Sequence, residues 1–484
     1  MARMAVVSFD DAPSAVPESP RTRPWWVLGV IAGIGGLLLG AQWILDARED
    51  AAVAALAGVP GVVPQLDGRI VVQHELTDDG MFALWQAANG EPAAPDLQVA
   101  DDGSQSVRSL DPATGEERWS VRLLGPDPAR ADAGVDAGRS SSCQSSADDA
   151  RQVVCLVTDG FVRYQDGRTA AIMPATTTDL VVLDAEDGRV VSRRPVPSGD
   201  QLAVLPGLAV VGEIEPGRGF LLTAYDLATG TRSWTHEDPF VRPAVTTETG
   251  SFWTLVQGAD VVAYDNGGDL RFVAADGTLV RRGVSPTDYL QTDPGTGALQ
   301  LVSYRADGSS TTTLLGPGAA AADDWVLDGY LLTPSVDDGS VPRLVLSVSS
   351  GGILHAWDVA TREERWTEDL PTANGALVVR GSVYLITQSG IVALDGRTGA
   401  TRWTAEAPPR NAPVSVFTDG RHVLASFQPT AAGLGSDVVA YAFSSGAEVW
   451  RAPLPDGVVS AMAVGSALVG YGQDGLAGVV LGSP

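Results

Sequence analysis

Short apolar runs separated by glycine- and aspartate-rich turns recur along most of this chain. Residues 383–387 form one such run, rich in β-branched and aromatic side chains, and Gln-Ser-Gly separates it from a second run at 391–394. The stretch at 400–404, which contains the polar residues Thr401 and Arg402, follows the next turn as a further strand candidate. Runs this short, with turn signals between them, are typical of antiparallel strands connected as a meander. The pattern therefore predicts an all-β fold.

One apolar run near the N-terminus is of a different kind. Residues 25–45 carry no charged side chain, and tryptophans lie at both ends of the stretch. A helix of this length spans about 30 Å, which is the thickness of the hydrocarbon core of a bilayer. Indole rings favour the interface between membrane and water. We therefore predict a transmembrane helix over residues 25–45.

Flanking charges predict the orientation of this helix. Arg3, Arg21 and Arg23 precede it, whereas the sequence Asp-Ala-Arg-Glu-Asp follows it. The positive-inside rule places the N-terminus in the cytoplasm and the rest of the chain outside. The alternative is a cleaved signal peptide, whose apolar region is normally only about 7–15 residues long. We expect an uncleaved anchor in the cell membrane, with a disordered tail at 1–24, a stalk at 46–58 and a β domain at 59–484.

A nine-residue motif recurs in the β domain: Asp, two variable residues, Thr, Gly, three variable residues and Trp. The three full copies carry Asp111, Gly115 and Trp119; Asp226, Gly230 and Trp234; and Asp395, Gly399 and Trp403. Three partial copies run from Asp358 to Trp366 with Arg362 at the glycine position, from Asp184 to Ser192 with Gly188 kept, and from Ala442 to Trp450 with Gly446 kept.

Each motif residue has a mechanical role. The aspartate can accept hydrogen bonds from backbone N–H groups two or three residues further on and so tighten a turn. The glycine relieves the strain of a left-handed backbone conformation, which would cost Arg362 about 1 kcal/mol. The tryptophan offers a large apolar surface that can pack between neighbouring sheets. We interpret the motif as a structural device rather than a binding site.

The spacing of the turn position indicates the architecture. Successive turn positions at 188 and 230, at 362 and 399, and at 399 and 446 lie 37 to 47 residues apart, close to the period of a propeller blade. The longer spacing from 115 to 188 predicts an insertion, and the gap from 230 to 362 leaves room for further blades.

The motif, its period and its tryptophan strand resemble the PQQ-like propeller repeat. That repeat occurs in quinoprotein dehydrogenases and in the non-catalytic scaffold lipoprotein of the outer-membrane protein assembly machine. The resemblance covers residues 59–484 and implies a β-propeller of four-stranded antiparallel blades, eight in number, with seven as the alternative. The eighth blade comes either from a second blade in the middle gap or from a strand near 69–75 that joins the C-terminal run 467–481.

The chemistry of the chain does not favour an enzyme. Many quinoprotein dehydrogenases carry adjacent cysteines and a calcium site, and this chain has two separated cysteines and few asparagines. Its four histidines are scattered, and no serine stands in a nucleophile elbow. We expect no catalytic, cofactor or metal site. The alternatives to a binding module are a PQQ-dependent dehydrogenase and a small-ligand sensor.

Net charge and topology bound the partners. The formal net charge is −27, and the chain contains no lysine. Nucleic-acid binders normally carry a basic patch, so nucleic acid is not expected as a partner. The membrane holds residues 25–45, and the expected partner is a protein of the cell envelope. The predicted function is an extracytoplasmic binding or scaffolding domain.

The two cysteines, Cys143 and Cys155, are predicted to form a disulfide. Both lie on the expected outer side of the membrane, where oxidation is permitted. The alternative is one buried and one exposed free thiol. Cys155 lies in an apolar run, and Cys143 lies in the serine-rich segment that we assign to the insertion before residue 188.

Overall fold

The computed structural model describes most of the chain beyond residue 48. The described residues are 49–76, 81, 84–85, 96–111, 116–133, 141–146, 151–165, 168–215, 218–239, 255–266, 269–284, 288–292, 298–316, 321–370, 374–430, 435–472 and 478–484. The chain divides into two compact units, residues 1–53 and residues 54–484. The predicted transmembrane segment at 25–45 lies outside the described residues, and among those that are described no helix is long and apolar enough to cross a bilayer.

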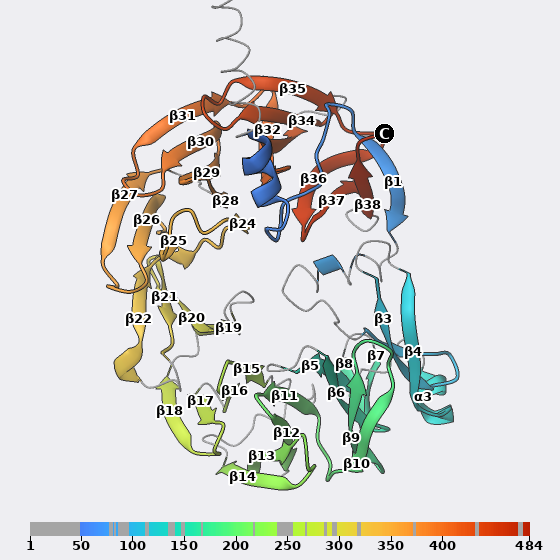
Figure 1. The fold of residues 1–484 in the computed structure, drawn as a ribbon. Coiled ribbons are helices and arrows are strands. Elements are labelled where there is room, and N and C mark those ends of the chain that lie inside the picture. Colours follow the sequence, from blue (N-terminus) through green and yellow to red (C-terminus); the bar gives the residue numbers. More distant parts are fainter. Residues whose placement is uncertain are drawn as a thin grey trace, which may run out of the picture. The chain divides into compact units, whose positions relative to one another are not determined.

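Antiparallel sheets follow one another in chain order through the first half of the second unit (Figure 1). The first is three-stranded: β2 (Asp96–Val99), β3 (Gln105–Leu110) and β4 (Glu117–Leu124). The next is β5 (Ser142–Ser145), β6 (Gln152–Thr158), β9 (Thr178–Asp184) and β10 (Val190–Pro195). Two more follow: β11 (Gln201–Leu205), β12 (Leu208–Glu215), β13 (Gly219–Asp226) and β14 (Arg232–Pro239), then β15 (Val256–Gln257), β16 (Val261–Asp265), β17 (Asp269–Ala274) and β18 (Leu279–Val284).

The second half continues in the same way. Its sheets are β19 (Asp288–Thr292), β20 (Leu299–Tyr304), β21 (Ser310–Leu314) and β22 (Trp325–Asp328); then β23 (Tyr330–Leu331), β25 (Leu344–Val348), β26 (Ile353–Asp358) and β27 (Glu364–Asp369). There follow β28 (Asn374–Val379), β29 (Ser382–Thr387), β30 (Gly390–Asp395) and β31 (Thr401–Glu406), with β24 (Val336–Asp337) added in parallel, and β32 (Asn411–Thr418), β33 (His422–Pro429), β34 (Asp437–Ala442) and β35 (Glu448–Pro453).

The last sheet joins the two ends of the second unit. β36 (Val458–Val464), β37 (Ala467–Gly472) and β38 (Gly478–Gly482) pair in order, and β1 (Val71–Leu76) completes the sheet by pairing with β38. An N-terminal strand that completes the C-terminal sheet is the closure expected of a β-propeller. The strand that the sequence places near 69–75 is therefore present.

The gap between residues 230 and 362 holds two sheets, β15–β18 and β19–β22. The sequence offered two alternative origins for an eighth blade, a second sheet in this gap and a closing sheet built from both ends of the domain. Both sheets are present in the structure. The described residues contain nine sheets of three or more strands, so the predicted count of eight blades, or seven, is not confirmed.

Central strands are apolar on both faces because a sheet lies on each side of them. In β29 every residue is buried, and in β33 five consecutive residues are buried. One core cluster joins Leu377 and Tyr384 with Val423 and Phe427 of the following sheet. Strands buried on both faces read as continuous apolar runs rather than as alternating patterns, which explains the runs seen in the sequence. Leu56, in the predicted stalk, also belongs to this cluster.

Candidate protein-binding surface

The motif turns are closed by the aspartate, as the sequence suggests. In the turn between β30 and β31, the Asp395 carboxylate accepts hydrogen bonds from the backbone N–H groups of Arg397 and Thr398, at 3.0 and 3.1 Å. Its second oxygen accepts a hydrogen bond of 2.7 Å from Arg402, the residue before the motif tryptophan. Asp226 and Asp358 close their turns in the same manner. Asp111 pairs with Arg118, while Gly115 lies outside the described residues.

The paired arginines change the acidity of the motif aspartates. The hydrogen bond from Arg402 lowers the pKa of Asp395 to about 2, and the hydrogen bond from Arg365 does the same for Asp358. Burial of each carboxyl acts in the opposite direction and is outweighed. These aspartates are therefore ionised at all physiological pH values, and their carboxylates stabilise the turn.

Four of the five motif tryptophans pack on the turn between the third and fourth strands of the following sheet. The Nε1–H of Trp403 donates to the carbonyl of Phe443 at 2.9 Å, and the ring lies over Gly446. Gly446 has a φ of 66°, and a Cβ there would lie 2.4 Å from the ring. The indoles of three other copies donate to Ala185, Ala275 and Gly396 in the same way; they belong to Trp119, Trp234 and Trp366.

The five motif tryptophans differ in burial. Trp119, Trp366 and Trp403 are buried, whereas Trp234 and Trp450 are partly buried. Trp450 packs against Gly68, which precedes β1, and so joins the closing sheet to its neighbour. The tryptophans are occupied by contacts between sheets, which leaves the ring faces of the buried copies unavailable for a quinone.

Arginine side chains bridge neighbouring sheets at two of the three partial copies. Arg362 takes the glycine position with a φ of 59°, as the sequence predicts, and its guanidinium donates to the carbonyls of Asp323 and Asp324 in the preceding sheet. In the copy that ends at Ser192, Arg194 lies against Gly230 of the following sheet. The junctions without a tryptophan or a glycine are thus bridged by arginine side chains.

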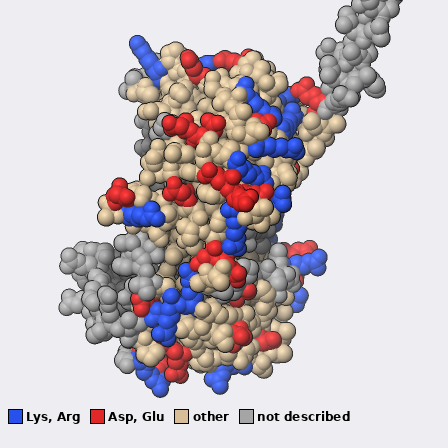
Figure 2. Space-filling model, turned by 90° about the vertical axis from the view of Figure 1, so that its left-hand side faces the viewer, with Lys and Arg blue, Asp and Glu red and all other residues tan. Residues whose placement is uncertain are grey.

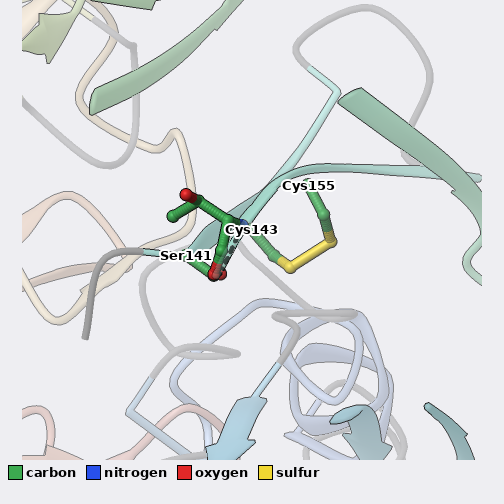
Figure 3. The surroundings of a disulfide bond; sticks show 4 residues. Ser141, Cys143 and Cys155 are labelled. Carbon is green, nitrogen blue, oxygen red and sulfur yellow. Dashed lines mark hydrogen bonds between the residues drawn. A yellow bond between two sulfur atoms is a disulfide. The ribbon is translucent and has the colours of Figure 1, made fainter. Parts of the chain in front are cut away.

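The predicted disulfide between Cys143 and Cys155 is present (Figure 3). The two cysteines face each other directly on β5 and β6, with their Cα atoms 4.0 Å apart. Beside them, the Ser141 hydroxyl donates to the Thr158 carbonyl at 3.1 Å and accepts from the Thr158 N–H. Cys143 therefore lies on a regular strand, and its assignment to the insertion before residue 188 is wrong.

The insertion consists of other segments, all at one end of the sheets. At this end of each sheet, a turn joins the second strand to the third, and the chain leaves the fourth strand for the next sheet. We call it the "connection end". The hairpin of β7 (Phe161–Gln165) and β8 (Arg168–Met173) interrupts the turn from β6 to β9, and α3 (Pro128–Ala133) lies between β4 and β5. The motif turns lie at the opposite end, which we call the "motif end".

Helix α3 and the hairpin are held together by one buried arginine. Arg130 is 1% exposed; it donates to the Gly160 carbonyl at 2.7 Å and lies over the Phe161 ring at 4.7 Å. Burial lowers the pKa of its guanidinium, and Asp127 and Asp159 oppose that effect. The two inserted elements therefore form a single fixed projection at the connection end. Sequence reasoning found the length of this insertion but not its position.

A buried polar network lies at the same end of the sheets β11–β14 and β15–β18. One oxygen of Asp238 accepts hydrogen bonds from Tyr264, Asn266 and Arg271, at 3.0, 2.7 and 3.0 Å. Arg271 is only 2% exposed, and it also pairs with Asp269 at 3.4 Å. Burial and the Asp238 carboxylate raise the pKa of Tyr264. The network joins two adjacent sheets, and sequence reasoning missed it because its residues lie far apart in the chain.

The described residues do not gather into a metal site: no group of three or more His, Cys, Asp or Glu side chains is placed to hold an ion. Two of the histidines pair with carboxylates, His355 with Glu364 at 2.8 Å and His422 with Asp419 at 3.1 Å. Figure 2 shows arginine and acidic side chains interspersed over the side of the molecule that carries β22 and β27. That side is a mixed charged surface rather than a field of one sign.

Comparison with known proteins gives the chain a family. A family model described as outer membrane protein assembly factor BamB matches residues 103–288 and 313–471. No curated protein sequence matches the chain.

Among solved structures, BamB from Moraxella catarrhalis is similar at 16% identity, covering 72% of this chain and 99% of that one, with a TM-score of 0.31. A eukaryotic initiation factor is similar at 10% identity, with coverages of 75% and 88% and a TM-score of 0.39. The Cps50 (Swd1) β-propeller domain of Myceliophteria thermophila is similar at 11% identity, with coverages of 59% and 97% and a TM-score of 0.30.

Proposed function

The chain belongs to the family of the outer membrane protein assembly factor BamB, and from this membership we propose that it is a membrane-anchored, extracytoplasmic β-propeller that binds protein partners at the cell envelope. The observation that carries the proposal is the family match over most of the β domain. The geometry agrees with it, because the repeat residues serve contacts between sheets and the inserted elements project from the connection end. One fold hosts both enzymes and scaffolds, so the fold alone does not decide between these two functions.

The projection of α3 and the hairpin β7–β8 is the part of the connection end best suited to reach a partner. An isolated two-stranded hairpin is marginally stable in water, and here Arg130 fixes its base. Both outer edges of a hairpin offer backbone N–H and C=O groups to another chain.

The experiment is affinity isolation of the full-length protein from gently solubilised membranes of its native host. The matched variant replaces residues 163–171 by Asn-Gly, which keeps Phe161 under Arg130. We expect one envelope protein to co-purify at constant ratio with the wild type and to be lost from the variant, while both proteins melt at similar temperatures. Equal co-purification would move the partner site away from the hairpin, and the absence of any partner would contradict the scaffold role.

The second candidate function is a PQQ-dependent dehydrogenase, which the repeat resemblance alone favours. Addition of PQQ with Ca²⁺ to the purified protein separates the two. A saturable shift of the quinone spectrum together with dye reduction would support the enzyme; we expect neither.

The location is tested by reporter fusion. Anchoring through residues 25–45 with the N-terminus in the cytoplasm predicts that a reporter active only in the cytoplasm is silent when fused after Pro484. Activity of that fusion would reverse the topology.

A further inference from the structure

Two neighbouring sheets, β19–β22 and β23–β27, expose large apolar side chains where they meet at the connection end. Leu301 packs in a cluster with Val261 of the preceding sheet. Because side chains alternate along a strand, Val302 and Tyr304 point to the other side, toward the sheet of β25. Tyr289 is paired with Val302 and so shares that side.

The opposing sheet presents its own apolar side chain to the same junction. Leu354 packs with Ala376 of the following sheet, so its neighbour Ile353 points to the opposite side, toward the preceding sheet. Tyr289 is 62% exposed, Tyr304 is 60% exposed and Ile353 is 39% exposed. Each would bury apolar surface against a partner. We call these three residues the "tyrosine junction".

Carboxylates border the tyrosine junction. Asp369 is paired with Ile353 across β26 and β27, and Asp307 lies in the turn that follows Tyr304. Asp328 ends β22; it lies 3.7 Å from His355 Nε2, yet its side chain remains 53% exposed. Arg305 is the one arginine in the described turn from β20 to β21. The border is therefore net negative, and the whole chain carries a formal charge of −27 without a single lysine.

Exposed tyrosine rings and exposed carboxylates at one junction have a matching partner chemistry. Arginine and lysine side chains bind the faces of aromatic rings through cation–π attraction and pair with carboxylates. Complementary charge also speeds the encounter and rejects acidic partners. We propose that the tyrosine junction is the docking site for an arginine- or lysine-rich segment of an envelope protein. This inference rests on the proposed function, since it names the chemistry of the partner.

The test measures binding of fluorescein-labelled nona-arginine to the full-length protein in nanodiscs of zwitterionic lipid, by fluorescence anisotropy. We expect saturable binding to the wild type that weakens as salt rises. The double variant Tyr289→Ser/Tyr304→Ser changes no charge, and we expect its Kd to rise about tenfold. The double variant Tyr289→Phe/Tyr304→Phe keeps both ring faces and should bind within about twofold of the wild type.

Matched controls separate the junction from general attraction to an acidic protein. Val359→Ser alters an apolar side chain that is 47% exposed in the motif turn between β26 and β27, and it should leave the Kd unchanged. An uncharged glycine-serine nonapeptide should not bind. An unchanged Kd in the serine double variant, or equal binding of the uncharged peptide, would overturn the proposal.

A folding check and a second variant keep the test decisive. If the serine double variant does not melt like the wild type, Asp328→Asn/Asp369→Asn is measured in its place, and the proposal again requires weaker binding. If the junction variants bind like the wild type but a partner still co-purifies through the hairpin β7–β8, only this inference is wrong. If no partner co-purifies either, the proposed function is also wrong.

Discussion

The contact between Trp403 and Gly446 gives the sharpest test of how neighbouring sheets are held together. Trp403 is 8% exposed, its Nε1–H donates to Phe443, and its ring lies 5.7 Å from that of Tyr384. Truncation of a large buried aromatic side chain costs about 3–5 kcal/mol. About 1 kcal/mol of this comes from the hydrogen bond to Phe443. We therefore expect Trp403→Ala to lower the free energy of unfolding by about 4 kcal/mol.

Gly446 tests the same contact from the other side. Alanine at this position would place its Cβ 2.4 Å from the Trp403 ring and would hold a φ of 66°. The conformation alone costs about 1–2 kcal/mol, and the clash adds to it. In the Trp403→Ala background the clash is gone, so Gly446→Ala should then cost only the conformational part. The two substitutions are therefore predicted to be strongly non-additive.

The assay is urea unfolding of the full-length protein in detergent, followed by intrinsic fluorescence and by circular dichroism. The control is Val449→Ala, because Val449 is 52% exposed and lies next to Trp450; it should change stability by less than about 0.5 kcal/mol. Additive costs for Trp403→Ala and Gly446→Ala would refute direct packing of the ring on the turn. An unchanged unfolding midpoint for Trp403→Ala would reopen a ligand role for this tryptophan.

Three further predictions concern pH, the disulfide and the buried network. The pKa of Asp395 is lowered to about 2 from a usual value of 3.8, so its contribution to stability is present above about pH 4 and is lost as the pH falls toward 2. Asp395→Asn should therefore reduce the change of the unfolding midpoint with pH in this range. An unchanged pH profile would contradict the pairing with Arg402. Closure of the loop between Cys143 and Cys155 should contribute about 3 kcal/mol to the free energy of unfolding in the chain-entropy model. Thiol counting should find free thiols only after reduction. Two free thiols in protein taken from the envelope would refute the bond. Asp238→Asn leaves Arg271 buried without its main countercharge, so it should destabilise the folded protein by about 3–5 kcal/mol. The exposed pair of Arg218 and Glu215 serves as the control. Glu215→Gln should lower the free energy of unfolding by less than about 1 kcal/mol.

The repeat could be predicted from the sequence because its physics is local. An aspartate that tightens a turn, a glycine at a left-handed position and a tryptophan on the next strand lie within nine residues. Arg362 is an example: its left-handed backbone conformation can be predicted from its position in the motif. Its bonds to Asp323 and Asp324, however, depend on the preceding sheet.

The remaining features depend on contacts between distant residues. Cys143 looked like part of a serine-rich loop, because only its pairing with Cys155 shows that the segment is a strand. Asp238 and Arg271 gave no signal, since 32 intervening residues and a sheet boundary separate them. The tyrosine junction also becomes visible only through strand register and exposure. Secondary structure and repeat period were readable in the sequence, whereas the surface that would contact a partner was not.

The central claim, that this propeller binds a protein through its connection end, is tested most directly by photo-crosslinking in the living envelope. Because the chain lacks lysine, a photoreactive amino acid is placed instead of Arg163 on β7, and in a control instead of Thr361 in a motif turn. Both positions are exposed. We predict a single protein adduct from position 163 and none from position 361. Equal labelling from both positions, or no protein adduct from position 163, would contradict the claim.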